Sequence, residues 1–256
     1  MNKNLFRVVV LFILLIVSSN AFAAPKINDI LQQIDSITEL KADGTAKVKI
    51  TQQKMGGGIK VYECIYYRRD TDKSFLIVMT KPEDEKGNGY LKQGDNMWMY
   101  RMNTRTFQHI GRDESIEGSD AKTQDFENKK LTEMYKPARD KSGKEIINET
   151  KLGDIPVYQF NLNAKIEDVA YPKVTYWVRQ DNYLPLKIQS YSFSGTLMET
   201  AYHINYAQFG DTYLQIKMMF IDEFEKSKTL VEISNISQQK IDNYVFTKAY
   251  LENLSK

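Results

Sequence analysis

Few residues of this chain combine a type and a spacing that could carry out chemistry. Its 256 residues include a single cysteine, Cys64, and two histidines, His109 and His203. A thiol next to an imidazole can act as a nucleophile activated by a base. Nothing in the spacing of these three residues singles out such a pair, which stays an open alternative. Cys64 lies in the strand-like run 61–67, where the role of a small buried apolar side chain is favoured.

Metal binding and acid–base catalysis have no better support in the sequence. No cluster of Cys and His has the spacing of a zinc site. The motifs H-E-x-x-H and G-x-S-x-G do not occur. Carboxylates are numerous on turns, but no pair stands out for proton transfer. We therefore expect no catalytic residue, no metal and no cofactor, and predict that the protein is not an enzyme.

The chain is instead rich in soft and aromatic side chains, with 10 Met, 16 Tyr, 12 Phe and 2 Trp. Met adapts to irregular apolar shapes, and Tyr and Trp give large contact areas with a polar edge. In the alternating run 97–100, Met97 and Met99 face one side, and Trp98 and Tyr100 face the other. One side is expected to pack under covering helices or to line a cavity. Which side does so is open, and an ordinary β-core is an equal alternative.

The first residues have the pattern of a targeting segment. Lys3 and Arg7 precede an apolar run over 8–17, and the small-residue site Ala21-Phe22-Ala23 follows. This order is typical of a secretory signal peptide. The apolar run is short for a membrane-spanning helix, which needs about 20 such residues. We predict a signal peptide over residues 1–23, cleavage after Ala23, and export to the periplasm without a lipid anchor.

The charge of the chain argues against two classes of partner. Lys3 and Arg7 account for the formal net charge of +2, so the exported chain is neutral. A neutral chain lacks the basic surface that binds nucleic acid or anionic membranes. We predict no nucleic-acid partner, and a single domain over residues 24–256.

Hydrophobic periodicity predicts a mainly β protein. The run 28–40 has apolar residues at helical spacing. Over 45–110 and 145–236 the dominant pattern is alternation, with turn residues between the strand-like runs, whereas 111–143 is polar and rich in charge. Short helices are predicted over 124–135 and 245–254. Consecutive strands with short turns predict an antiparallel meander of about eleven strands, which must curl on itself or have one face covered. The helical segments are the candidates for this cover.

Several stretches, in this order and spacing, together resemble a bacterial family. They are Lys86-Gly87-Asn88-Gly89-Tyr90-Leu91-Lys92, Asp95-Asn96-Met97-Trp98-Met99-Tyr100, Arg105, Gly118-Ser119-Asp120, Tyr176-Trp177-Val178-Arg179, Leu184-Pro185-Leu186-Lys187 and Phe246-Thr247-Lys248-Ala249-Tyr250-Leu251. The family is that of the outer-membrane lipoprotein-sorting proteins, the LolA-like group related to LolA and LolB. The resemblance covers nearly all of the predicted mature chain.

The resemblance implies a half-open β-barrel of about eleven antiparallel strands, with a helical lid over a concave apolar face. LolA and LolB carry the acyl chains of lipoproteins across the periplasm without making or breaking a bond. The expected function is therefore that of a periplasmic carrier or chaperone, which binds the acyl chains of lipoproteins or lipids for transfer towards the outer membrane. An inner-membrane transporter or an outer-membrane acceptor would be further partners. The alternative is a periplasmic sensor or interaction module of the same fold, which binds lipoproteins or a membrane-protein partner.

The resemblance also implies a gate. In LolA an arginine that follows an aromatic-rich strand contacts the lid, and the matching stretch here is Ile65-Tyr66-Tyr67-Arg68-Arg69. Arg69 is the first candidate for this role and Arg68 the second. After Gly118-Ser119-Asp120, the stretch 121–126 is more polar than is common in the family, which puts the grip of the lid on a ligand in question. The predicted lining of the apolar cavity is Tyr67, Phe75, Ile77, Tyr90, Met97, Trp98, Met99, Tyr100 and Trp177.

Overall fold

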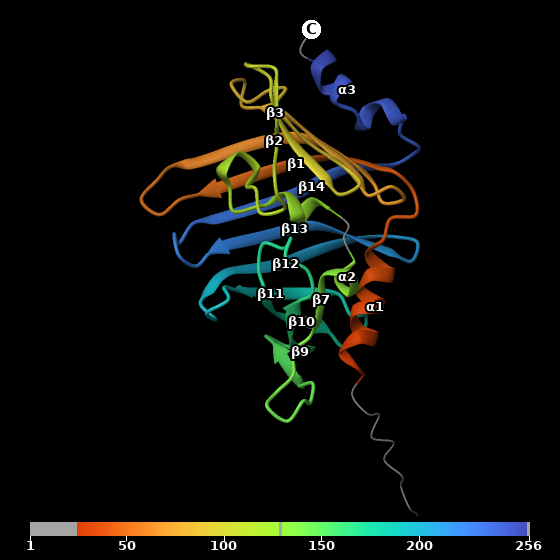
Figure 1. Cartoon of the computed structure of the whole chain (residues 1–256), viewed down its shortest axis with the longest axis vertical. Helices are drawn as coiled ribbons and strands as arrows, with labels where there is room; N and C mark the ends of the chain where they lie inside the picture. The colour runs from red at the N-terminus through yellow and green to blue at the C-terminus, as the bar shows by residue number, and fades with distance from the viewer. Residues whose placement is uncertain (1–24, 128–129, 255–256) are drawn as a thin grey trace, which may run out of the picture.

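The architecture is a single open antiparallel sheet. The computed structural model describes residues 25–127 and 130–254, so the predicted signal peptide, residues 1–23, lies outside the described residues. The 14 strands have the order β6-β5-β4-β3-β2-β1-β14-β13-β12-β11-β10-β9-β7, and β8 also pairs with β9. Strands that follow each other in the chain are mostly neighbours in the sheet (Figure 1). The predicted mainly β, half-open architecture is therefore confirmed.

The strands are β1 (Gly44–Gln53), β2 (Ile59–Arg69), β3 (Ser74–Lys81), β4 (Gly89–Gln93), β5 (Asn96–Arg101), β6 (Thr106–His109), β7 (Tyr135–Pro137), β8 (Ile147–Leu152), β9 (Ile155–Ala164), β10 (Lys173–Arg179), β11 (Pro185–Tyr191), β12 (Leu197–Phe209), β13 (Thr212–Asp222) and β14 (Lys228–Gln238). They number 14 rather than the predicted eleven or so. Part of the difference is β7, which has 3 residues and no alternating pattern of its own.

The helices are short. Helix α1 (Ile27–Thr38) agrees with the predicted helix over 28–40. The predicted helix over 124–135 is wrong in its extent, because the chain there forms the 3-10 turn η2 (Thr123–Phe126), then α2 (Leu131–Met134), and enters β7 directly afterwards. The predicted C-terminal helix is divided into the 3-10 turn η3 (Asn243–Phe246) and α3 (Lys248–Asn253). Within residues 25–127 and 130–254, no helix has the length and apolarity needed to cross a membrane.

One face of the sheet is covered by the segment that connects β6 with β7. Strand β6 lies at one end of the strand order and β7 at the other, and residues 110–127 and 130–134, which lie between them in the chain, are here called the crossing segment. Figure 1 shows this green segment in front of the sheet. Its residues Ile116 and Phe126 are buried in the core cluster that includes Ile50 and Phe220 of the sheet. We call this covered face the inner face.

Helix α1 extends the same cover. Its apolar side, with Ile30, Leu31 and Ile34, is buried in a cluster with Phe160 of β9 and Tyr176 of β10. The three-and-four spacing of these residues places them on one side of a helix, which is why the segment folds as an amphipathic helix against the sheet. Helix α1 and the crossing segment together form the lid of the inner face.

The outer face is covered at one end by the C-terminal segment. Phe246 of η3 and Leu251 of α3 are buried with Leu76, Leu91 and Tyr100 of the sheet. Strands β3 and β4 therefore have buried side chains on both faces. The predicted alternation of run 97–100 is confirmed, since Met97 and Met99 belong to the inner cluster while Trp98 packs against the outer one.

The close packing of α3 on the sheet gives a first prediction. A Cβ added at Gly89 would lie 2.5 Å from Leu251 Cδ2 and 3.1 Å from the Ile77 carbonyl oxygen, and the carbonyl belongs to the sheet backbone. We expect Gly89→Ala to lower the free energy of unfolding by about 1–3 kcal/mol through overpacking. Urea denaturation measures the change. The matched control is Gly58→Ala, because a Cβ there meets nothing within 4 Å; equal midpoints for the two variants would contradict the prediction.

Candidate functional site

A cavity lies between the lid and the inner face. Its volume is about 200 Å³. Ile34 of α1, Leu131 of α2 and Phe126 of η2 form the lid side, and strands β10 to β14 form most of the opposite wall. Because alternate residues of a strand point to the same face, the wall consists of residues two apart on successive strands. These pairs are Val174 and Tyr176, Ile188 and Ser190, Ala201 and His203, and Met218 and Phe220, with Ile233 on the next strand.

The two walls of the cavity differ in polarity. The sheet side is mostly aliphatic and aromatic, with Glu199 as its one carboxyl group, whereas the lid side carries those of Asp35, Asp125 and Glu127. Buried carboxyl groups need hydrogen-bond partners. The partners of these three groups tie the lid to itself and to the sheet.

Asp35 joins the two helices of the lid. Its carboxylate accepts hydrogen bonds from the backbone nitrogens of Leu131, at 2.6 Å, and of Thr132, at 3.1 Å. It also accepts one from the Thr132 hydroxyl, at 2.6 Å. The first N–H groups of a helix have no partner within the helix, so Asp35 of α1 caps α2. Burial raises the pKa of Asp35, and the hydrogen bonds to Thr132 and Leu131 oppose that rise.

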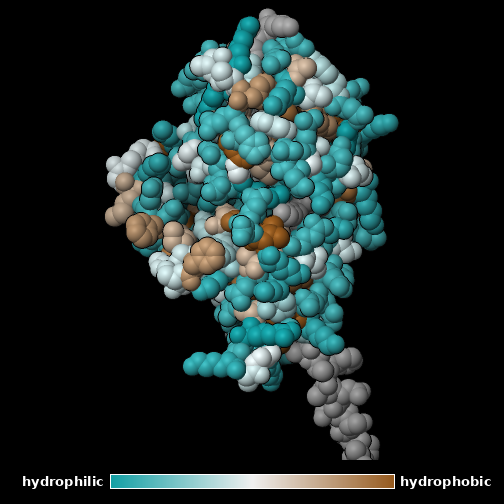
Figure 2. All heavy atoms as spheres, viewed as in Figure 1, coloured by the Kyte–Doolittle hydropathy of each residue, from teal (hydrophilic) through white to brown (hydrophobic). Residues whose placement is uncertain are grey.

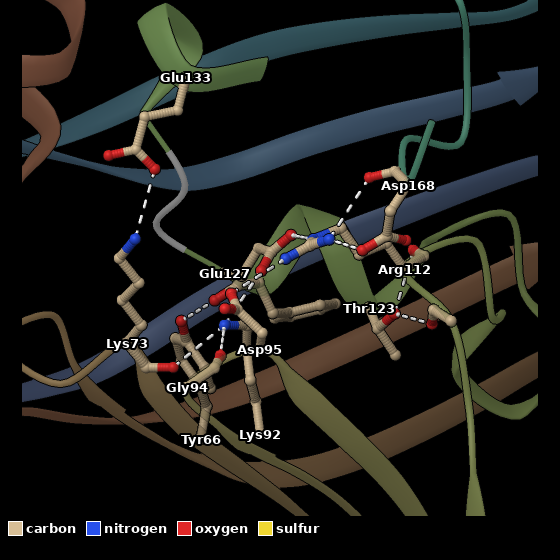
Figure 3. Close-up of polar contacts among 12 residues, drawn as sticks. Tyr66, Lys73, Lys92, Gly94, Asp95, Arg112, Thr123, Glu127, Glu133 and Asp168 are labelled. Carbon is tan, nitrogen blue, oxygen red and sulfur yellow. Dashed lines mark hydrogen bonds and ion pairs between the residues drawn. The ribbon is translucent and has the colours of Figure 1, made fainter. Parts of the chain in front are cut away.

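Glu127 joins the crossing segment to β4 and to itself in an ion-pair network with Lys92 and Arg112 (Figure 3). Its carboxylate lies 2.6 Å from Arg112 Nε and 3.5 Å from Lys92 Nζ. All three side chains are buried. Arg112 also pairs with Asp168 in the β9–β10 connection, so the network reaches the far end of the sheet. Breaking one partner of a buried ion pair is strongly destabilising, and the network therefore fixes where the crossing segment lies.

A second polar cluster surrounds Lys122. Its ammonium lies 2.8 Å from Glu199 Oε2 on β12 and 5.0 Å from the ring centre of Tyr171. The Tyr171 hydroxyl donates to the same carboxylate oxygen, at 3.1 Å. The Lys122 backbone nitrogen donates to Asp125 Oδ2, at 2.7 Å. Burial and the nearby Glu199 carboxylate raise the pKa of Asp125 to about 7.

The two candidate gate arginines lie in different places. Arg68 lines the cavity and forms a bidentate ion pair with Asp70. Its Nε lies 2.6 Å from Asp70 Oδ1, and its Nη2 lies 2.8 Å from Asp70 Oδ2. Its Nη2 also donates to the carbonyl oxygen of Thr38, the last residue of α1, at 3.1 Å. Arg69 instead donates to Asn243, at 2.7 Å, and lies 4.5 Å from the ring centre of Phe246, both in the C-terminal segment. Gating stays a prediction for both residues, and this geometry favours Arg68.

The nine residues predicted for the cavity lining lie elsewhere. None of them is among the residues that line the 200 Å³ cavity. Phe75, Ile77, Tyr90, Met97 and Met99 are buried on the inner face under the crossing segment.

The other four lie outside the inner core. Tyr67, Trp98 and Tyr100 belong to the outer cluster with the C-terminal segment. Trp177 is half-buried beneath the Lys187 ammonium, 4.7 Å from its ring centre. Contact of any of the nine with a ligand stays a prediction.

The residues that do line the cavity carry a weak sequence signal. Val174, Ile188, Met218 and Phe220 are ordinary alternating strand residues, and nothing local separates them from the rest of the core. They are selected by the position of the lid, α1 together with the crossing segment, and that position depends on contacts between distant parts of the chain.

The groups considered for nucleophilic chemistry are buried or peripheral. Burial raises the pKa of Cys64 to about 12, so its thiol keeps its proton at neutral pH. Burial lowers the pKa of His203 to about 4, so its imidazole is neutral. His109 lies on the edge strand β6, its ring edge-on to Trp98. Among the described residues, no group of three or more His, Cys, Asp or Glu could hold a metal ion.

The raised pKa of Asp125 predicts a pH dependence of stability. Between its ordinary value of 3.8 and about 7, the folded protein holds a proton that the unfolded chain releases. This carboxyl group therefore lowers the free energy of unfolding as pH rises through that window. Asp125→Asn removes the titration and keeps an oxygen for the Lys122 N–H. We expect urea denaturation between about pH 4 and pH 7 to show a smaller fall for this variant than for the wild type. Asp154→Asn, in an exposed turn, is the control; the same pH profile for both variants would refute the prediction.

Comparisons with known proteins agree with the predicted fold. A LolA superfamily protein from Nitrosomonas europaea superposes with a TM-score of 0.74 at 20% identity, over 89% of this chain and 100% of the other. A domain from Vibrio parahaemolyticus, assigned to outer membrane lipoprotein sorting, gives 0.76 at 18% identity, over 88% and 97%. A DUF1329 family protein from Desulfovibrio piger gives 0.74 at 20% identity, over 87% and 96%. At these identities the likeness establishes the fold.

At the level of sequence, a search of curated proteins gives no match. One family model, described as "Uncharacterized protein", matches residues 71–253, which is more than half of the chain. The resemblance to the LolA-like group is confirmed by the solved structures. The chain therefore belongs to the family of this model, and its fold is that of the LolA superfamily.

Proposed function

We propose that the protein is an exported periplasmic carrier, which binds an acyl chain of a lipoprotein or lipid in the cavity beneath its lid and passes it on towards the outer membrane. The observation that carries the proposal is the cavity itself, with a mostly aliphatic and aromatic sheet wall on one side and a separate lid on the other. The descriptions of two structural relatives, one a LolA superfamily protein and one assigned to lipoprotein sorting, support it.

The sheet wall supplies the free energy for such binding. Each methylene buried from water contributes roughly 0.8 kcal/mol. Ten methylenes against Val174, Ile188 and Phe220 would contribute about 8 kcal/mol, which corresponds to a dissociation constant on the order of 1 μM before ordering costs. No bond needs to form or break, because transfer requires only that the acceptor offers an equally apolar place.

The size of the cavity requires the lid to move. Its volume of about 200 Å³ is below the roughly 300–1,000 Å³ of sites that hold drug-sized ligands. An acyl chain therefore enters only when α1 or the crossing segment withdraws from the sheet. The polar attachments of the lid suit this step, since ion pairs and hydrogen bonds can be exchanged for contacts with water.

Filling the cavity tests the proposal. Ala201 of β12 lines the wall, and Ala201→Phe places a ring in the space that an acyl chain would occupy. We expect this variant to bind a fluorescent fatty-acid analogue about tenfold or more weakly, because fewer methylenes can be buried. Ile204→Phe is the matched control, on the same strand but exposed. Equal affinity for both variants, with unchanged circular dichroism, would rule out binding in this cavity.

A second prediction separates the two arginines. Arg68→Gln removes the link between β2 and the end of α1, so we expect the bound acyl probe to dissociate about three- to tenfold faster, as the net loss of one hydrogen bond of about 1 kcal/mol implies. Arg69→Gln breaks contacts with the C-terminal segment and should lower stability without changing the dissociation rate. Stopped-flow displacement measures the rates. Faster release from Arg69→Gln alone would assign the gate to Arg69.

A further inference from the structure

Exposed large apolar side chains gather at one end of the sheet. Met55 in the β1–β2 connection is 77% exposed, Phe193 in the β11–β12 connection 84%, and Phe224 in the β13–β14 connection 77%. Figure 2 shows brown and pale-brown spheres gathered at the left of the view, where Figure 1 shows these connections. We call these three connections the hairpin end.

The pairing register places the three tips in one row. Gln53, at the end of β1, pairs with Lys228, at the start of β14. Asp222, at the end of β13, pairs with Glu199, near the start of β12. The three hairpins are therefore neighbours in the sheet and turn at the same end. Two strand spacings separate adjacent tips, or roughly 10 Å.

The two aromatic tips are held in place by their own turns. Asp222 Oδ1 accepts the N–H groups of both Phe224 and Glu225, each at 2.7 Å. In the other turn, the backbone nitrogen of Ser192 donates to the Thr196 carbonyl oxygen, at 3.0 Å. Both Phe side chains thus project into solvent from turns whose backbone is hydrogen-bonded.

The pattern fits a lipid surface better than a protein partner. Protein interfaces need a continuous, closely packed centre, whereas here small or charged residues, such as Gly56, Ser194 and Glu225, separate the projecting side chains. Lipid can surround each side chain singly, so separate tips can insert independently. Nearby charges are balanced, as in the pair of Lys226 with Glu223 at 3.3 Å, so apolar insertion rather than charge would drive binding.

A groove beside Phe193 at this end of the sheet shares one lining residue with the cavity. It has a volume of about 750 Å³ and is lined by Phe193, Met198, Val169 and Tyr171, among others. Tyr171 also lines the cavity beneath the lid. An acyl chain that leaves the cavity past Tyr171 would therefore emerge beside the exposed Phe193.

We propose that the hairpin end docks on the surface of a phospholipid bilayer by inserting Met55, Phe193 and Phe224. The docking goes beyond the carrier function and does not require an occupied cavity. A protein that fails to bind an acyl chain could therefore still dock on a bilayer, and a protein that fails to dock could still bind an acyl chain.

Vesicle flotation with the full mature chain tests the docking, using vesicles of phosphatidylethanolamine and phosphatidylglycerol. We expect the wild type to float with the vesicles. The triple variant M55S/F193S/F224S should bind about tenfold or more weakly, because three apolar side chains lose their transfer free energy. The control I204S/L254S removes exposed apolar side chains elsewhere and should bind like the wild type. A wild type that does not float, or a triple variant that floats equally well, overturns the proposal.

A site-specific probe gives an independent measurement. Cys64 is the only cysteine and is buried, so a thiol dye attaches selectively to F224C. The emission of an NBD dye at position 224 should shift to the blue when vesicles are added, while the same dye on I204C should not change. Equal responses at the two positions overturn the proposal. So does a dimer in analytical ultracentrifugation that the triple variant abolishes while the dye at position 224 shows no response to vesicles.

Discussion

The apolar inner face of an open sheet has to be covered, and the rest of this structure depends on that constraint. Strands β6 and β7 lie at opposite ends of the sheet, so the chain between them has to cross the inner face. The passage has little regular structure and brings backbone and charged groups over an apolar surface. Because buried polar groups need partners, the crossing segment is held by Glu127, Lys122 and Asp125 rather than by apolar side chains alone.

The lid consequently combines two kinds of attachment. Helix α1 is attached by apolar packing of Ile30, Leu31 and Ile34, and such packing is close to non-directional. The crossing segment is attached by ion pairs that work only in one geometry. A buried ion pair adds little net stability compared with apolar residues, but removing one partner costs about 3–5 kcal/mol. The polar attachments therefore fix where the lid closes more than how firmly it stays closed.

The local features of this fold could be predicted from the sequence, and the long-range ones could not. Alternation along each strand and the helical spacing of 28–40 depend on neighbouring residues, so the strands and α1 were predictable. The split of Met97 and Met99 from Trp98 and Tyr100 follows from the same alternation. The alternation does not indicate which face of the sheet borders the cavity. Side chains on the other face of β3 to β5 are also buried, because the C-terminal segment packs on them. Arg68 and Arg69 show the same limit: adjacent residues point to opposite faces, and only the position of the lid decides between them.

The polarity of the two cavity walls has a consequence for any ligand. The sheet wall offers Val174, Ile188 and Phe220, whereas the lid wall carries Asp35 and Asp125. An acyl chain gains most by lying along the sheet, and a carboxyl group loses least when it is protonated or hydrogen-bonded. The pKa values of Asp35 and Asp125 are raised because burial in this space disfavours their charged forms. An amphiphile in the cavity would thus be oriented by the protein, with its hydrocarbon against the strands and its polar groups towards the lid.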